Sequence, residues 1–185
     1  MKTVIYLLVF LFINQFAFGQ TSTNQTTFIS SEILQKIKYD VEKSIPAYRN
    51  ELVAKNMNAN QIEFSIDTFR IEQIVSKRMD INTTTSGMNV TVLEATKSYD
   101  SLMNKYYNKL LKRLKQEDKK ILIEAQKAWL TYRDAERKLI GVVNKDAYTG
   151  GGTIYRNIAV GTYAELVESR TIMIFNYYES ILNLY

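Results

Sequence analysis

The chain has 185 residues, of which 46% are apolar and 12% aromatic, and its formal net charge is +5. This composition is sufficient for the core of one domain, or of two small ones, and argues against a largely disordered chain. Because the chain has no cysteine and no histidine, a disulfide, a cysteine-ligated zinc site, a cysteine nucleophile and a histidine general base are all excluded. One proline and seven glycines are few helix breakers, which favours long helices over a β-sandwich.

Residues 1–19 have the pattern of a secretory signal peptide. Lys2 precedes the apolar run 4–13, and Ala17-Phe18-Gly19 provides small residues at the two positions that a signal peptidase reads. The run is too short to span a bilayer as a stable helix. We therefore expect cleavage between Gly19 and Gln20, a periplasmic or secreted protein, and no membrane span after cleavage. Cleavage would remove Lys2 and no acidic residue, so the formal net charge would fall from +5 to +4.

The polar, aperiodic residues 20–28 predict a flexible tether, and the segment after them predicts a helix. Ser30 or Ser31 can cap this helix. Its apolar positions recur at helical spacing and are Ile33, Leu34, Ile37, Val41 and Ile45. Pro46 is expected to kink the helix or to begin a second segment that ends near Asn56.

A further helix is predicted over about residues 61–80. Asn60 and Glu63 resemble a capping box at its start. The apolar residues of 62–66 alternate as they would in a strand, but apolar positions continue to residue 75 without a turn signal, which favours the helix. The polar residues 82–87 then divide an N-terminal helical region, residues 29–82, from residues 83–185.

Three long helices are predicted in residues 83–185. The first, about 88–115, has apolar residues at helical spacing almost without error: Tyr99, Leu102, Met103, Tyr106, Tyr107, Leu110, Leu111 and Leu114. The second, about 117–144, is expected to bury Leu122, Ala125, Trp129, Tyr132 and Ile140. A glycine-rich loop over residues 145–153 leads to the third, about 155–184. The predicted fold class is all-α, an antiparallel bundle of these three helices with the N-terminal helices packed against it.

The run Gln126-x-x-Trp129-x-x-Tyr132-Arg133-Asp134-x-Glu136 resembles the LprI-type lysozyme-inhibitor domain, a family of small secreted or periplasmic helical proteins. Other parts of the family pattern are similar to Ser86-Gly87-Met88-Asn89, Asp100-x-x-Met103-Asn104-x-x-Tyr107, Gly150-Gly151-Gly152-Thr153 and Leu166 to Arg170. The resemblance covers about residues 83–180. The resemblance implies that this chain is not an enzyme and that it binds a lysozyme or another wall-cleaving enzyme.

The sequence departs from this family where members often carry cysteines. Val90, Arg137 and Thr162 stand at the corresponding places. A whole disulfide set is therefore absent, and its loss would cost roughly 2–4 kcal/mol of stability that packing must replace.

The glycine-rich loop is the candidate binding segment. Tyr148, Gly150, Gly151, Gly152 and Thr153 can bring backbone N–H and C=O groups close to a partner's cleft. A simple turn between antiparallel helices is the alternative. The loop lacks the lysine and the preceding strand of a phosphate-binding loop.

Gln126, Trp129, Arg133, Asp134 and Arg170 are the motif residues, and we expect a structural role for them. Trp129 is expected to anchor the core rather than to bind a ligand. The two arginines border or interrupt apolar stripes, and a buried arginine needs a partner. We expect at least one of them to join two helices through an acid, the candidates being Glu94, Asp100, Asp134 and Glu136.

No acid pair stands out as catalytic, and we predict no catalytic residue, no cofactor and no metal. Three functions remain open: a lysozyme inhibitor, an envelope module that binds an anionic wall polymer or a protein partner, and a wall hydrolase that uses carboxylates alone. The mild positive charge lacks the dense clusters of a nucleic-acid-binding protein. It also repels basic lysozymes, so inhibition of those enzymes requires local complementarity.

Overall fold

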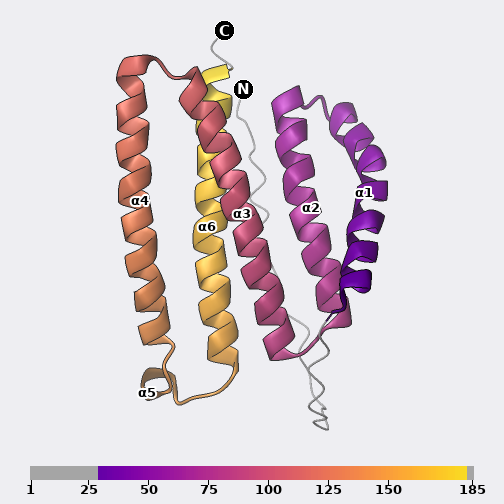
Figure 1. Cartoon of the computed structure of the whole chain (residues 1–185), viewed down its shortest axis with the longest axis vertical. Helices are drawn as coiled ribbons and strands as arrows, with labels where there is room; N and C mark the ends of the chain where they lie inside the picture. Colours follow the sequence, from indigo (N-terminus) through magenta and orange to yellow (C-terminus); the bar gives the residue numbers. More distant parts are fainter. Residues whose placement is uncertain (1–28, 183–185) are drawn as a thin grey trace.

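The computed structural model describes residues 29–182, so the predicted signal peptide and tether, residues 1–28, lie outside the described residues. Within this range the chain forms helices and no strand (Figure 1). The helices are α1 (Ser31–Ala54), α2 (Ala59–Ile81), α3 (Thr85–Arg113), α4 (Gln116–Val143), α5 (Asp146–Thr149) and α6 (Ile154–Leu182). The all-α prediction is confirmed. Among these helices, none combines the length and apolarity that crossing a membrane requires.

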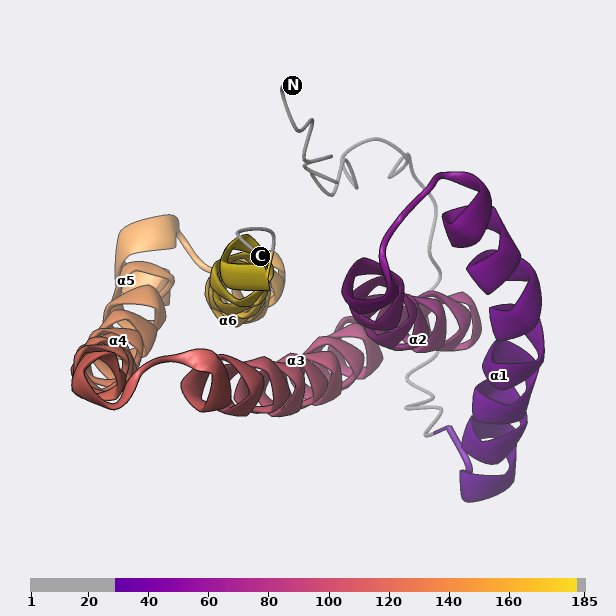
Figure 2. The same ribbon diagram turned by 90° about the horizontal axis from the view of Figure 1, so that it is seen from above.

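Successive long helices run in alternating directions, so α3 and α6 run parallel to each other and pack together at the centre (Figure 1). Thr171 Oγ1 of α6 donates a hydrogen bond to the carbonyl oxygen of Tyr99 in α3 at 3.1 Å. In Figure 2, α4 lies on one side of this pair, and α2 lies on the other with α1 beyond it. The first and third helices of the predicted bundle are therefore its central pair, and α4 is an edge helix.

The main core is built from aromatic and aliphatic side chains of α2, α3 and α6. Tyr106 and Ile174 are fully buried. Phe64 of α2 stacks on Phe175 of α6 with the ring centroids 3.9 Å apart, and the Tyr106 ring meets both of them edge-on. A second cluster joins α1 to α2 and consists of Ile45, Leu52, Ile62 and Ile66.

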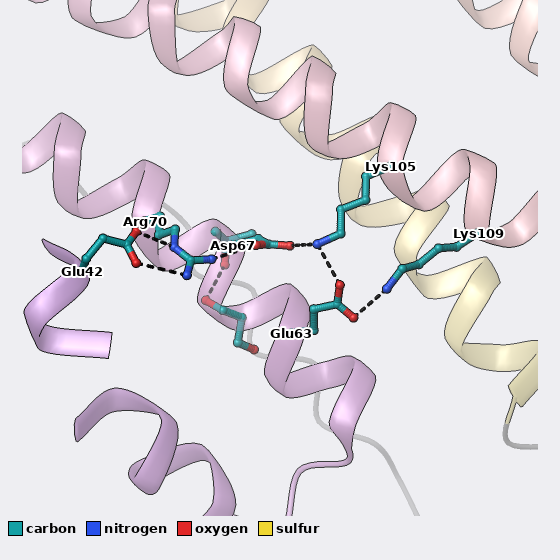
Figure 3. Close-up of polar contacts among 8 residues, drawn as sticks. Glu42, Glu63, Asp67, Arg70, Lys105 and Lys109 are labelled. Carbon is teal, nitrogen blue, oxygen red and sulfur yellow. Dashed lines mark hydrogen bonds and ion pairs between the residues drawn. The ribbon is translucent and has the colours of Figure 1, made fainter. Parts of the chain in front are cut away.

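A ladder of ion pairs ties α1, α2 and α3 together beside this core (Figure 3). Its members, in spatial order, are Glu42, Arg70, Asp67, Lys105, Glu63 and Lys109. Lys105 Nζ lies 2.8 Å from a Glu63 carboxylate oxygen, and Lys109 Nζ lies 2.6 Å from the other. Because each charge in the middle of the ladder has two partners, the ladder fixes the register of α2 against α3.

The second segment considered at Pro46 is not present, because α1 continues through this residue from Ser31 to Ala54. Proline removes one N–H donor from the helix, and the carbonyl that loses its partner belongs to the exposed Glu42, where water can replace the bond. Figure 2 shows that α1 curves along its length.

Two helices begin earlier than the sequence predicted because their caps lie upstream. Asn58 and Gln61, not Asn60 and Glu63, form the capping box of α2. Thr84 Oγ1 accepts a hydrogen bond from the Gly87 N–H at 3.1 Å, so α3 begins inside the polar stretch that we expected to separate two regions. The alternating residues 62–66 are helical, as predicted.

The edge position of α4 corrects the prediction of its buried face. Leu122, Gln126 and Ile140 are its buried residues, whereas Ala125 and Tyr132, which we expected to be buried, are exposed. A helix with neighbours on one side only buries a narrow strip.

The predicted loop at 145–153 also contains one helical turn, α5. This turn ends at Gly150, which adopts the left-handed conformation at φ +78°.

Candidate functional site

Gln126 of α4 joins three helices through its side chain. Its Oε1 accepts hydrogen bonds from Arg170 Nε at 3.2 Å and from Arg170 Nη2 at 3.0 Å. Its Nε2 points to Met103 Sδ of α3 at 3.6 Å. Gln126 is only 8% exposed, so these contacts connect α4 to α6 and α3 inside the protein.

Trp129 lies half-buried against the main core, as expected of an anchor. Arg133 and Arg170 approach its ring, with their guanidinium carbons 5.5 and 5.7 Å from the ring centroid. At these distances a guanidinium is attracted to an aromatic face. The indole therefore helps to hold one arginine of α4 and one of α6.

Arg133 makes the interhelical contact that the sequence predicted. Its Nη1 lies 3.5 Å from Asp100 Oδ1 in α3, and its Nη2 lies 2.9 Å from the neighbouring Asp134. Asp134 is exposed and belongs to the same helix, so it orients Arg133 without joining helices. Arg170 also joins two helices, but through the neutral amide of Gln126 rather than through an acid.

Arg170 forms no ion pair within residues 29–181. Burial lowers the pKa of its guanidinium, and the nearby Tyr177 partly offsets this change. An arginine in a protein stays protonated, so a positive charge is held here by an amide and an aromatic ring. A groove of about 400 Å³ lies beside this seam, and Asp100, Gln126 and Arg133 line it. Because Asp100 pairs with Arg133 and Gln126 bonds Arg170, the polar groups that line the groove already take part in contacts between helices.

The candidate loop lies elsewhere, at the end of the molecule where α4 turns through α5 into α6 (Figure 1). Gly150, Gly151 and Gly152 have φ angles of +78°, +87° and +118°, a backbone conformation that favours glycine. The Gly151 N–H donates to Thr149 Oγ1 at 3.3 Å, and the Thr153 carbonyl accepts from the first turn of α6 at 3.2 Å. The loop therefore has local order, and its glycines are required by its backbone.

Large apolar residues before and after this loop in the chain are exposed to solvent. Tyr148 is 71% exposed and Ile154 is 58% exposed. Val142, Val143 and Ile158 are also exposed. Contiguous exposed apolar side chains mark interaction surfaces. We call residues 142–158, with these side chains, the loop end.

Sequence reasoning identified Tyr148 and the glycines of the loop end but missed Ile154 and the valines of α4. The available signal was α6 itself, whose apolar residues occur on all sides of the helix. Such a helix is normally covered all round, yet Ile154 and Ile158 in the first turns of α6 are exposed. The motif residues and the loop end are thus two separate places, one that fixes α4 and one that is open to a partner.

Two half-buried carboxylates, those of Glu72 and Glu168, approach the hydroxyl group of Tyr99. Glu72 of α2 accepts a hydrogen bond from the Tyr99 hydroxyl at 3.4 Å, and Glu168 of α6 approaches the same hydroxyl. Burial raises the pKa of both carboxyl groups, and the charge of Glu72 raises that of Glu168 further. Within residues 29–181, no three acidic side chains gather where they would hold a metal ion.

A sequence model of the family described as lysozyme inhibitor LprI matches residues 76–172, just over half of the chain. The matched region begins in the last turns of α2, includes α3, α4 and α5, and ends within α6. Both the motif residues and the loop end lie inside it, whereas α1 and most of α2 lie outside. No curated protein and no solved structure matches the chain significantly.

Proposed function

Because the chain belongs to the lysozyme inhibitor LprI family, we propose that it is a secreted, non-enzymatic protein that binds a lysozyme through its loop end. The signal-peptide pattern of residues 1–19 is the basis for the proposed export. The observation that carries the binding proposal is the exposed Tyr148 beside a glycine loop, with a rim of exposed apolar side chains.

The shape and charge of the loop end suit a carbohydrate-cleaving cleft. A glycosidase of the lysozyme type works with two carboxyl groups that flank the scissile bond. Within residues 142–158, Lys145 and Arg156 carry positive charge and Asp146 carries the one negative charge, so the loop end is positive on balance. These groups favour a pair of carboxylates locally, even where both proteins are basic overall.

The test uses the purified chain starting at Gln20. It measures whether this chain inhibits the clearance of cell-wall suspensions by lysozymes of several types, and calorimetry measures direct binding to the same lysozymes. Tyr148→Ala should weaken binding about tenfold or more, because an exposed aromatic anchor at an interface contributes about 1–3 kcal/mol. Tyr39→Ala is the matched control, since Tyr39 is also well exposed, at 62%, but lies on α1.

Two results would contradict the proposal. If Tyr148→Ala and Ile154→Asp both inhibit as well as the unaltered protein, the binding face is not the loop end. If the chain binds no lysozyme but sediments with purified cell wall in a salt-sensitive way, the function is that of a wall-polymer module.

A further inference from the structure

A second apolar face runs along α4, and none of the described helices covers it. Its seven residues follow one another at alternating spacings of four and three: Ile121, Ala125, Ala128, Tyr132, Ala135, Leu139 and Val142. All seven are exposed, with Ile121 at 60%, Tyr132 at 51% and Leu139 at 52%. We call these residues the α4 stripe. The core-facing residues of α4 lie on a different side of the helix.

The spacing of the α4 stripe is that of a helix which pairs with another helix. Alternating steps of four and three are the a and d positions of a coiled coil. Here the stripe extends over three heptads, and its three alanines allow two helix backbones to approach closely. We propose that a second copy of this chain covers the stripe, with α4 packed against α4 in antiparallel orientation about a two-fold axis.

Charges on the outer flank of the stripe support a second copy as the occupant. Ala125, Tyr132 and Leu139 take the a positions, so the residues before them, Glu124, Thr131 and Lys138, take the g positions. Charged g residues select the partner and the orientation of a coiled coil. This flank is acidic at Glu124 and basic at Lys138, and it is therefore complementary to itself when reversed.

The antiparallel alignment satisfies the apolar and the charged positions together. When Ile121 of one copy faces Leu139 of the other, Ala128 faces Tyr132. The same register brings Glu124 opposite Lys138 twice, by symmetry. Thr131 then faces its own symmetry mate, and the isologous contact closes at two subunits.

The same spacing continues in both directions: Glu117, in the first turn of α4, stands seven residues before Glu124, and Lys145, just past the end of α4, stands seven residues after Lys138. None of these four charged residues forms an ion pair within residues 29–181. A parallel alignment would instead place Glu124 beside Trp129, which already packs against the core of its own chain. The free charges therefore favour the antiparallel pair.

Sedimentation velocity of the purified chain over a range of concentrations tests the proposal. A dimer that dissociates on dilution is expected. Glu124→Lys and Lys138→Glu should each weaken it about tenfold, because each change makes two like-charge contacts across the axis. The double variant Glu124→Lys/Lys138→Glu should restore the dimer. Lys112→Glu, on an exposed position of α3, is the control.

Cysteine chemistry gives a second test, since the chain has no cysteine of its own. Thr131→Cys should be joined into dimers by a short bismaleimide, and Lys112→Cys should not. A chain that stays monomeric at every concentration, a double variant no better than either single one, or equal cross-linking at both positions would overturn the proposal. Circular dichroism of each variant checks that these exposed substitutions leave the helices intact. The inference concerns self-association and does not depend on lysozyme binding.

Discussion

The two sides of the central α3–α6 pair are held in different ways. On the α2 side, stacked and edge-on aromatic rings interlock, and the ion-pair ladder of Figure 3 runs alongside them. On the α4 side, three residues are buried, and the polar contacts centre on Gln126. One side therefore has continuous packing, and the other has a narrow seam.

We propose that this difference separates stability, on the α2 side, from recognition, on the α4 side. The α2 side lies mostly outside the region that matches the family, whereas α4 and the loop end lie inside it. Packing from α1 and α2 thus supplies order to a chain in which no disulfide can form. The lightly packed α4 side keeps its apolar residues exposed, which a binding surface requires.

The largest effect that would sharpen this comparison is expected at Tyr106. Tyr106→Ala should lower the free energy of unfolding by about 3–5 kcal/mol, because the side chain is fully buried among aromatic rings. Leu139→Ala on α4 should change it by less than about 0.5 kcal/mol, because that side chain is exposed. Urea unfolding at low protein concentration measures both, and equal losses would remove the distinction between the two sides.

Tyr106→Phe is the control for this experiment. The Tyr106 hydroxyl is buried and has no hydrogen-bond partner among residues 29–181. Leaving a buried polar group unpaired costs free energy, so removing the oxygen should leave stability unchanged or raise it. A large loss in Tyr106→Phe would mean that the hydroxyl has a partner in solution.

An intermediate effect is expected at the seam. Arg170→Met should lower the free energy of unfolding by about 1–3 kcal/mol, because it leaves the buried Gln126 oxygen without its donors. The double variant Arg170→Met/Gln126→Leu should cost less than the sum of the single variants, because both members of the bond are removed. An unchanged melting temperature in Arg170→Met would show that the seam does not hold α4 in place.

The helices were predictable from the sequence because their apolar spacing is regular, as in Tyr99 to Leu114. The buried face of α4 was not, because this helix has two apolar stripes. The prediction combined Leu122 and Trp129 from one stripe with Ala125 and Tyr132 from the other. Helical spacing identifies apolar faces, but only the neighbouring helices determine which face is covered.

The contacts of the motif residues were predictable to the extent that charge dictates them. Arg133 beside an apolar stripe required an acid, and Asp100 was among the candidates. Arg170 instead donates hydrogen bonds to the neutral side chain of Gln126. A search of the sequence for acidic partners does not identify an amide. The approach of Glu72 and Glu168 to Tyr99 was not predictable either, because it depends on how three different helices, α2, α3 and α6, pack together.

The smallest effect concerns Glu72 and Glu168. Because burial raises the pKa of both carboxyl groups, the folded chain binds their protons more tightly than the unfolded chain does. The free energy of unfolding should therefore increase as the pH falls from 7 through their folded pKa values, and this gain is complete below their ordinary pKa of 4.5. Glu63 acts in the opposite direction. Burial raises its pKa, but Lys105 and Lys109 together lower it by more, so its pKa in the folded chain is below the ordinary value. Its protonation below pH 4.5 therefore destabilises the fold.

Glu72→Gln separates these contributions. It should stabilise the chain slightly at pH 7, because an amide next to Tyr99 and Glu168 carries no charge into the half-buried site. It should also reduce the rise in the free energy of unfolding as the pH falls from 7 to 4.5. Asp40→Asn, on an exposed position of α1, should do neither. Thermal unfolding of the three proteins across this pH range makes the comparison, and a rise of equal size in Glu72→Gln would show that the acid pair does not cause it. In that case other carboxyl groups would cause the rise in stability, and the negative charges of Glu72 and Glu168 beside Tyr99 would not destabilise the α2 side at neutral pH.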